Sequence, residues 1–315
     1  MATTDSKFIT IPATHIQFRR PESAFRNTIS KDGPFTPEAG RYHLYISSAC
    51  PWSDRTALVR KLKGLEDVIG LSVTDWFLGS EGWHFSERQD CIPDNINHFT
   101  HVKQLYLATD PQYAGRITVP VLWDKKTSQV VNNESSEIIR MFNSQFQDVC
   151  KNPQLDLCPS DLVKEIDELN SYVYDNVNNG VYKCGFAPSQ EAYDMNFKNL
   201  FEALDKLEER LSKSRYLVGN RFSEADIRLF VTLIRFDPVY FGHFKCNKRQ
   251  IKDYPALCGY VCDIYQMPPV KSTVNIFHIK HHYYESHRQI NPTGIVPDGP
   301  LLDYLEQPHT ERAKL

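Results

Sequence analysis

Apolar and polar residues follow three different patterns along the 315-residue chain. Residues 1–40 show no sustained period and contain several prolines, which predicts an irregular N-terminal arm. From residue 42 the run YHLYIS predicts a strand, helical spacing from Ser53 to a stop at Gly64 predicts a helix, and VIGLSVTDW at residues 68–76 predicts a second strand. A strand, a helix and a strand in so short a stretch form a βαβ unit, whose two strands are parallel.

The following segment, residues 77–109, is rich in Gly, Trp and Asn and predicts a long loop. Apolar runs at 119–123 and 129–132 flank a Lys-Lys-Thr-Ser turn, which predicts an antiparallel hairpin. The hairpin is followed by ESSEIIRMFNSQF, residues 134–146, whose apolar residues share one helical face. This order of elements resembles the thioredoxin-like fold, and we interpret residues 41–148 as a domain of that kind.

From residue 159 to the end of the chain the apolar period is helical almost throughout, which predicts an all-helical second domain with a C-terminal extension. Two amphipathic stripes follow candidate N-caps at Ser160 and Ser189. Ser223 and Asp226 have the spacing of a capping box, and the helix after them is apolar on more than one face, so we expect it to be central. The last residues, QPHTERAKL, are interpreted as a solvated tail.

Composition excludes several classes of function. The formal charge of −3, with 24% charged residues, gives no basic surface for a nucleic-acid backbone. No run approaches the ~18 apolar residues of a membrane span, and the first residues are unlike a secretory signal, so we expect a cytoplasmic protein. The eight scattered cysteines are expected to be thiols, and Cys258 and Cys262 to be packed in the core, since no metal-finger spacing accompanies them. We therefore predict no bound metal.

The sequence SSACPWSDR places Cys50 between the first predicted strand and the first predicted helix. At that junction the positive end of the helix dipole favours the thiolate over the thiol, and Arg55 could add positive charge. Pro51 suits the first helical turn, which does not use its missing N–H. Ser53 stands where a dithiol redox enzyme has its second cysteine, so a mixed disulfide on Cys50 would be cleared by an outside thiol such as glutathione. The alternative is a buried cysteine at a chance junction.

Two more motifs bear on the same chemistry. Val119-Pro120 opens the predicted hairpin, where a proline is also expected simply because a strand begins there. In thioredoxin-like folds this proline is cis and lies beside the cysteine. Glu134 and Ser135 open the helix after the hairpin; alone they are ordinary capping residues, but with Cys50 they mark a site for the γ-glutamyl end of glutathione.

Together these motifs resemble the glutathione transferase superfamily. More narrowly, the segments WFLGSEGWHFSE, NNGVYKCGFA and HIKHHYYESHRQINPTGIVPDGP are similar to the Xi class, the glutathionyl-hydroquinone reductases. The resemblance runs from about residue 41 to the C-terminal region. It implies a thioredoxin-like N-terminal domain, an all-α C-terminal domain, glutathione as co-substrate and assembly as a homodimer.

The resemblance also assigns site residues. Cys50 matches the family's catalytic cysteine, and five residues match its glutathione contacts: Trp83, Arg116, Val119, Glu134 and Ser135. Tyr182 and Tyr283 match its substrate-site tyrosines, and Tyr284 is adjacent. Asp54 departs from the family, in which many members have histidine, and its carboxylate would make the Cys50 thiolate less favourable. Neutral phenols suit a hydroquinone leaving group as hydrogen-bond donors, although tyrosines are also often packed with satisfied hydroxyls.

The implied function is glutathione-dependent reduction of glutathionyl-hydroquinones through a mixed disulfide between Cys50 and glutathione, releasing hydroquinone and oxidised glutathione. Two alternatives remain at this point. An Omega-like thioltransferase or dehydroascorbate reductase would use the same cysteine without the tyrosines. A non-catalytic binding protein would keep the fold and lose the chemistry.

Overall fold

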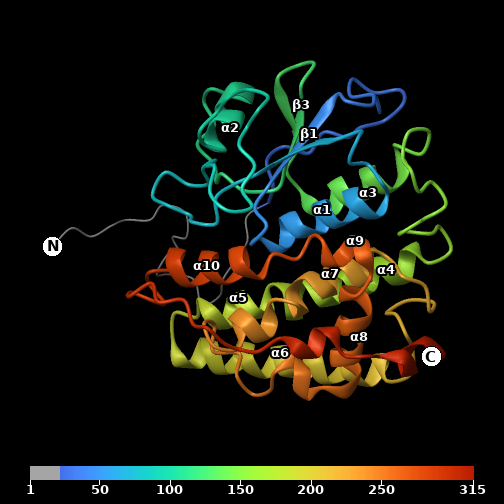
Figure 1. The fold of residues 1–315 in the computed structure, drawn as a ribbon, viewed down its shortest axis with the longest axis vertical. Helices are drawn as coiled ribbons and strands as arrows, with labels where there is room; N and C mark the ends of the chain where they lie inside the picture. The colour runs from blue at the N-terminus through green and yellow to red at the C-terminus, as the bar shows by residue number, and fades with distance from the viewer. Residues whose placement is uncertain (1–21) are drawn as a thin grey trace. The chain divides into compact units, whose positions relative to one another are not determined.

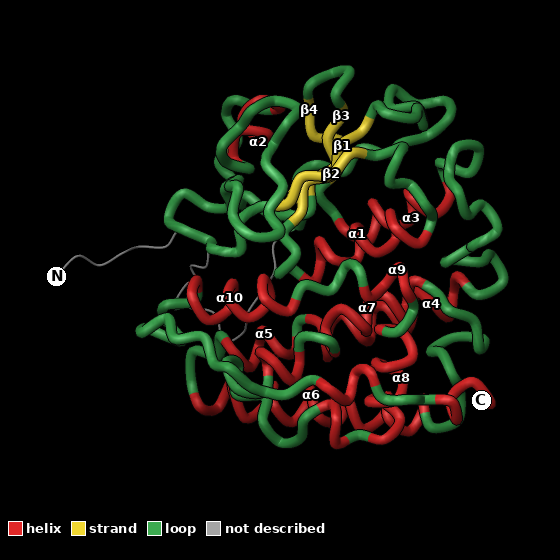
Figure 2. Tube along the Cα trace, in the orientation of Figure 1, coloured by secondary structure: helices red, strands yellow, loops and turns green. Residues whose placement is uncertain are grey.

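The computed structural model describes residues 22–315, which divide into two compact units. The first ends at Gln154 and the second begins at Leu155. Figures 1 and 2 show strands only in the first unit, which is called the thioredoxin-like unit below, and mainly helices in the second, the helical unit. Part of the predicted N-terminal arm, residues 1–21, lies outside the described residues.

The thioredoxin-like unit contains a four-stranded sheet in the order β2-β1-β3-β4. β1 and β2 are parallel, and β3 is antiparallel to both β1 and β4, so the predicted βαβ unit and hairpin are confirmed. α1 and α3 pack against each other, and α2 packs against β4. The bounds of the elements are β1 Tyr42–Ile46, α1 Pro51–Leu62, β2 Gly70–Val73, α2 Lys103–Thr109, β3 Val121–Asp124, β4 Gln129–Asn132 and α3 Ser135–Ser144.

Local sequence explains where these elements begin and end. Every residue of β1 is buried, as expected for a central strand between two neighbours. α1 begins at Pro51 and is followed by Gly64, whose φ of +65° is the left-handed conformation that a helix stop requires. At α3 the Glu134 side chain accepts a hydrogen bond from the Ser136 backbone N–H, which caps the helix.

The predicted loop at residues 77–109 is wrong at its end, because α2 occupies Lys103–Thr109. This helix has seven residues and no side-chain cap, so neither its length nor its start gives a sequence signal. Its buried residues, Leu105 and Tyr106, belong to an apolar cluster that includes strand residues. Tertiary packing therefore stabilises a helix that local sequence does not specify.

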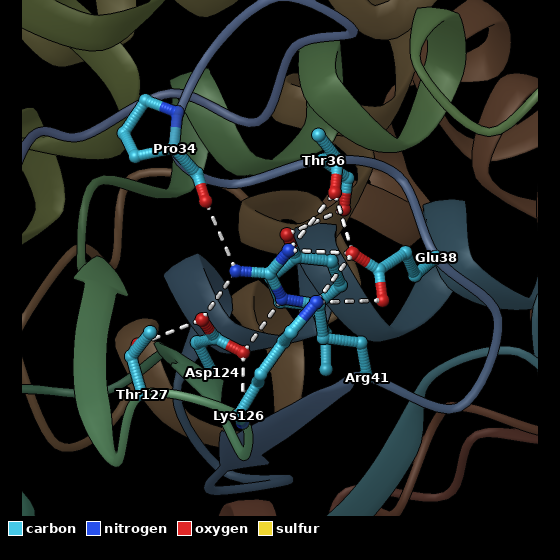
Figure 3. Close-up of polar contacts among 8 residues, drawn as sticks. Pro34, Thr36, Glu38, Arg41, Asp124, Lys126 and Thr127 are labelled. Carbon is cyan, nitrogen blue, oxygen red and sulfur yellow. Dashed lines mark hydrogen bonds and ion pairs between the residues drawn. The ribbon is translucent and has the colours of Figure 1, made fainter.

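A buried ion pair joins the start of β1 to the end of β3 (Figure 3). The Arg41 guanidinium donates to both carboxylate oxygens of Asp124, at 2.9 and 2.7 Å, and also to Glu38 and to the Pro34 carbonyl. Burial would raise the pKa of Asp124, but hydrogen bonds from Arg41, Thr127 and the Lys126 N–H outweigh it and lower this pKa. The segment before β1 is thus tied to the sheet by a charge-assisted network.

The helical unit contains α-helices and short π and 3₁₀ turns. Among them, α5 and α6 pack closely, and α8 contacts α6, α7 and the last two turns. The bounds are α4 Val163–Val173, η1 Tyr174–Asn178, α5 Gly180–Gly185, α6 Gln190–Leu211, α7 Glu224–Leu233, η2 Phe236–Tyr240, η3 Ile251–Asp253, α8 Pro255–Tyr265, α9 Pro268–Lys271, α10 Ile276–Ser286, η4 Asp303–Glu306 and η5 Thr310–Lys314.

Two of the three predicted helix starts are confirmed. Ser189 caps α6 by accepting from the Ala192 N–H, and Ser223 and Asp226 form the capping box of α7. The predicted central position of α7 is also confirmed, since nine of its ten residues are buried. Ser160 does not cap α4, because residues 160–162 form a turn and the helix begins one residue later.

The interpretation of the last residues as a solvated tail is wrong at Arg312. Its side chain is buried and donates to four backbone carbonyl groups, those of Leu211, Ala256, Ser214 and Arg215. The carbonyls of Leu211, Ser214 and Arg215 lie 97–101 residues earlier in the chain, and that of Ala256 lies 56 residues earlier. No local sequence pattern points to contacts at such separations. One arginine therefore holds the C-terminal turn against the helical unit.

Three further observations concern the described residues. All eight cysteines, which lie between residues 50 and 262, are thiols. Within residues 22–315, no cluster of three or more His, Cys, Asp or Glu side chains could hold a metal ion. In the same part of the chain, every helix is too short or too polar to cross a bilayer.

Candidate active site

Cys50 lies immediately before the first helix of the thioredoxin-like unit. Its backbone is extended, with φ −78° and ψ 121°, and its carbonyl accepts the first helical hydrogen bond, from the Asp54 N–H at 3.0 Å. Its thiol is half-buried. The sulfur therefore lies at the N-terminal end of α1, the position that the sequence predicts for it.

The loop before β3 reaches the same cysteine. Cys50 Sγ lies 3.7 Å from the Val119 carbonyl oxygen, and the Val119-Pro120 peptide bond is cis. Both features expected of this proline in a thioredoxin-like fold are confirmed. A backbone segment next to a reactive sulfur can pair with the main chain of a bound peptide, which is the chemistry that glutathione offers.

Trp83 lies in the loop that follows β2, and Arg116 lies just before Val119. Trp83 is buried in an apolar cluster that also contains Val119 and contacts Cys50. Its carbonyl accepts from the Val102 N–H, which fixes the loop beside α2. Arg116 is exposed, and its carbonyl accepts from the Tyr113 hydroxyl at 2.9 Å. The structure thus brings Cys50, Trp83 and Val119 together. The exposed Arg116 lies three residues before Val119 in the chain.

Glu134 and Ser135 begin α3. The Glu134 carboxylate accepts from the Ser136 N–H and hydroxyl and from the Ser23 hydroxyl, at 2.8–3.1 Å. Burial would raise the pKa of Glu134, but these hydrogen bonds, together with the charge of Arg55, lower it below its usual value. Glu134 is consequently ionised at neutral pH and suited to bind an ammonium group.

Ser135 is buried, and its hydroxyl accepts from Arg55 at 3.5 Å. The structure places the Arg55 guanidinium at the start of α3, and its contribution of positive charge at Cys50 stays a prediction. Sequence reasoning also missed Ser23, which lies 111 residues before Glu134 and in a segment without regular structure. The start of α3 therefore has the Glu134 carboxylate and the Ser135 hydroxyl, and the buried Arg55 side chain of α1 reaches that hydroxyl.

Asp54, the predicted departure from the family pattern, is buried in the first turn of α1. The Asp54 backbone N–H donates a hydrogen bond to the Cys50 carbonyl, so Asp54 lies one helical turn after Cys50. An acidic residue therefore lies one helical turn after the candidate nucleophile, and its effect on the thiol stays a prediction.

The helical unit brings Tyr182 of α5 and Tyr283 of α10 together, 101 residues apart in the chain. Their hydroxyls are hydrogen-bonded, and Tyr283 is also bonded to the Tyr240 hydroxyl at 2.9 Å. Burial raises the pKa of Tyr240 and Tyr283 well above the usual value, so both are neutral phenols. We call Tyr182, Tyr240 and Tyr283 the tyrosine trio.

Aromatic side chains surround the trio. Phe244 contacts all three rings, with centroids 5.3–5.6 Å away, and Phe186 stacks on Tyr182. His243 and His287 lie within 3.2 Å of each other through Nε2 and Nδ1, and burial lowers the pKa of His243 to about 4. The histidines are therefore neutral at pH 7, and the trio lies among uncharged rings. Tyr284, which follows Tyr283 in the chain, contacts His243, with ring centroids 4.7 Å apart.

Sequence reasoning missed Tyr240. It occurs in FDPVYFGHF, a segment of apolar and aromatic residues that predicts only burial. No spacing rule connects it with Tyr283, which is 43 residues later. The π-helical turn η2, which ends at Tyr240, is the structural signal, since such turns often occur at functional sites.

Comparisons with known proteins agree with this geometry. Residues 49–145 match the profile described as the glutathione S-transferase N-terminal domain, and residues 190–261 match the glutathione S-transferase C-terminal domain. The chain is 52% identical over 302 residues to the glutathionyl-hydroquinone reductase YqjG of Escherichia coli, covering 93% of this chain and 92% of that protein. It is 50% identical to the glutathionyl-hydroquinone reductase PcpF of Sphingobium chlorophenolicum, with 90% of each chain covered.

Solved structures give the same result. The Xi glutathione transferase of Phanerochaete chrysosporium has a TM-score of 0.89 and 54% identity, covering 91% of this chain and 98% of that one. The glutathione-bound structure of YqjG from Escherichia coli K-12 has a TM-score of 0.89 and 51% identity, covering 93% and 97%. The chain described here therefore belongs to the glutathione transferase superfamily and, within it, to the Xi class.

Proposed function

We propose that this protein reduces glutathionyl-hydroquinones with glutathione. The observation that carries the proposal is the setting of Cys50: a half-buried thiol at the start of α1, next to the Val119 carbonyl, with Ser53 where a dithiol enzyme has a second cysteine. Two relatives, 52% and 50% identical to this chain, are named glutathionyl-hydroquinone reductases, which supports the same reaction here.

The reaction has two steps. The Cys50 thiolate attacks the sulfur of the glutathionyl-hydroquinone; the bond from that sulfur to the ring carbon breaks, the carbon takes a proton, and hydroquinone leaves. A second glutathione thiolate then attacks the glutathionyl sulfur of the mixed disulfide, releasing oxidised glutathione and the Cys50 thiolate. The sulfurs are oxidised to a disulfide and the ring carbon is reduced, so no further oxidant or reductant is needed.

The roles of the remaining residues follow from their chemistry. Val119 would pair with the peptide backbone of glutathione, and Trp83 and Arg116 would complete its contacts. Ionised Glu134 would accept from its ammonium group, and Ser135 at the helix N-terminus would bind its carboxylate. Tyr182 and Tyr283, as neutral phenols, would donate hydrogen bonds to the oxygens of the hydroquinone. Glutathione is a co-substrate in this scheme, and a homodimer remains a prediction from the family.

The test is steady-state reduction of glutathionyl-menadiol with excess glutathione. We expect turnover by the wild type, loss of turnover in Cys50→Ser, and unchanged turnover in Cys91→Ser, a matched control because Cys91 is also partly exposed and lies in the same unit. Activity on small disulfides without turnover of glutathionyl-menadiol would favour the thioltransferase alternative. Failure of Cys50 to react with an alkylating reagent that modifies free glutathione would favour a binding protein.

A further inference from the structure

We infer that Ser23 is a positioning residue for the binding of glutathione, because its hydroxyl holds the Glu134 carboxylate with one oxygen directed at the ammonium group of the ligand. This inference rests on the proposed function and adds a residue to it. The sequence predicts only an irregular arm over residues 1–40. The part of that arm described from residue 22 onward nevertheless brings a hydroxyl to the start of α3, where Ser23 is bonded to Glu134.

The first support is the backbone that places Ser23. Residues 23–27 run antiparallel to the end of β4 and the residues after it. The Asn27 N–H donates to the Val131 carbonyl, and the Asn133 N–H donates to the Phe25 carbonyl, both at 3.0 Å. The Asn133 side chain in turn accepts from the Phe25 N–H at 3.1 Å. Main-chain bonds therefore fix this segment beside the start of α3, independently of the Ser23 hydroxyl.

The second support is the unequal use of the two oxygens of Glu134. Oε1 accepts from both the N–H and the hydroxyl of Ser136, at 3.1 and 2.8 Å, whereas Oε2 accepts from the Ser23 hydroxyl at 3.0 Å. An ionised carboxylate has about four positions for donors, two on each oxygen. Among the contacts of the described residues, Ser136 therefore occupies both positions on Oε1, and Ser23 occupies one of the two on Oε2. An ammonium group would bind Oε2, the oxygen that Ser23 holds.

The Ser23 hydroxyl has one proton and two acceptors within reach. Glu134 Oε2 lies 3.0 Å away and the Asn133 carbonyl oxygen 3.4 Å away. The carboxylate takes the proton, because it is closer and a hydrogen bond to a charged acceptor is stronger. Burial would raise the pKa of Glu134, and this hydrogen bond is one of those that lower it below its usual value. Ser23 thus orients the carboxylate and also favours its charged form.

The same segment also supports a second predicted glutathione contact. The Phe25 ring packs on Tyr106 and Tyr113, with ring centroids 5.5 and 5.4 Å apart. The Tyr113 hydroxyl donates to the Arg116 carbonyl at 2.9 Å. Residues 23–27 therefore contact the site through Ser23 and, through Phe25, the turn that leads to Arg116. A test of Ser23 has to separate the loss of its hydroxyl from a loosening of the whole segment.

The test measures the Kd of glutathione by isothermal titration calorimetry. Ser23→Ala removes the hydroxyl and keeps the main-chain bonds, and we expect about fivefold weaker binding, an effect typical of one intramolecular hydrogen bond. Ser23→Thr keeps a hydroxyl and should bind glutathione as tightly as the wild type. Thr28→Ala is the control, because Thr28 is exposed in the same arm. An unchanged Kd in Ser23→Ala, or an equal rise in Kd in Ser23→Ala and Thr28→Ala, would overturn the inference.

A second ligand separates orientation of the carboxylate from a loosened segment. An analogue of glutathione that lacks the α-amino group offers Glu134 no ammonium group. We expect the wild type and Ser23→Ala to bind this analogue with the same Kd, so that the two proteins differ with glutathione alone. Equally weakened binding of both ligands by Ser23→Ala would show that Ser23 only maintains the fold, and would overturn the inference.

These measurements do not depend on turnover. If the wild type binds glutathione but does not reduce glutathionyl-menadiol, the proposed function has failed, and the Kd values still decide the role of Ser23. If the wild type turns over glutathionyl-menadiol, we expect Ser23→Ala to raise the KM for glutathione about fivefold and to leave kcat unchanged. A lower kcat with an unchanged KM would contradict a role in binding.

Discussion

The two units place their chemical groups in different ways. In the thioredoxin-like unit, Cys50, Val119 and Glu134 lie at the ends of elements, where backbone groups and helix dipoles are exposed to a ligand. In the helical unit, Tyr182 and Tyr283 lie within helices, in a buried cluster assembled from distant segments. Sites at element ends depend on local backbone geometry, whereas a site built from helix faces depends on packing across the whole unit.

This difference decided what could be predicted from the sequence. The strand-to-helix cysteine, the Val-Pro step and the Glu-Ser start of α3 are local motifs, and the structure places all three as expected. Tyr182 and Tyr283 were identified only through a resemblance, because no period connects residues 101 positions apart. Tyr240, Arg312 and α2 were missed for the same reason: each is held by contacts with distant segments, and its own sequence gives no start, stop or spacing.

The largest expected effect concerns the framework of the thioredoxin-like unit. Asp124→Asn should lower the free energy of unfolding by about 3–5 kcal/mol, because it removes the buried carboxylate that accepts two hydrogen bonds from the Arg41 guanidinium. Urea unfolding followed by circular dichroism would measure it. Lys151→Ala removes an exposed pair with Asp67 and should leave the free energy of unfolding almost unchanged. Equal losses in the two variants would contradict this account.

The same pair predicts a pH dependence. The pKa of Asp124 is lowered in the folded protein, so its stabilisation is fully present above the ordinary pKa of about 4 and is lost as the pH falls through the folded value. The difference in unfolding free energy between wild type and Asp124→Asn should therefore shrink below about pH 4. A difference that stays constant down to pH 2 would show that the charge of Asp124 is not responsible.

The next effect distinguishes the two units directly. Tyr283→Phe should reduce kcat for glutathionyl-menadiol about a hundredfold, since a positioned proton donor contributes about 10²–10⁴-fold. Exchange of Cys50 with a small disulfide should be unaffected, because that reaction uses only groups of the thioredoxin-like unit. If both activities fall together, Tyr283 maintains the fold and has no separate part in the reaction.

A smaller effect is expected at the start of α3. Glu134→Gln should raise the KM for glutathione about tenfold with little change in kcat, because a hydrogen bond to a charged group contributes about 1.5–3 kcal/mol. Glu137→Gln is the control, since Glu137 lies in the same helical turn and pairs with Arg26 instead. A similar KM for both variants would show that Glu134 only caps the helix.

The smallest effect tests the helix starts of the helical unit. Ser189→Ala should cost about 1 kcal/mol of stability, because it removes the cap of α6. Ser160→Ala should cost nothing measurable, since Ser160 does not cap α4. Thermal unfolding of the two variants would show whether the structure or the sequence pattern identifies the true cap.

The central claim is that Cys50 carries the glutathionyl group between substrate and product. The most direct test mixes the protein, in excess and without added glutathione, with glutathionyl-menadiol, and follows menadiol release and protein mass together. We predict one menadiol released for each glutathionyl group gained, with the group located on Cys50 by peptide mapping and released by glutathione. Menadiol release without modification of Cys50 would contradict the mechanism.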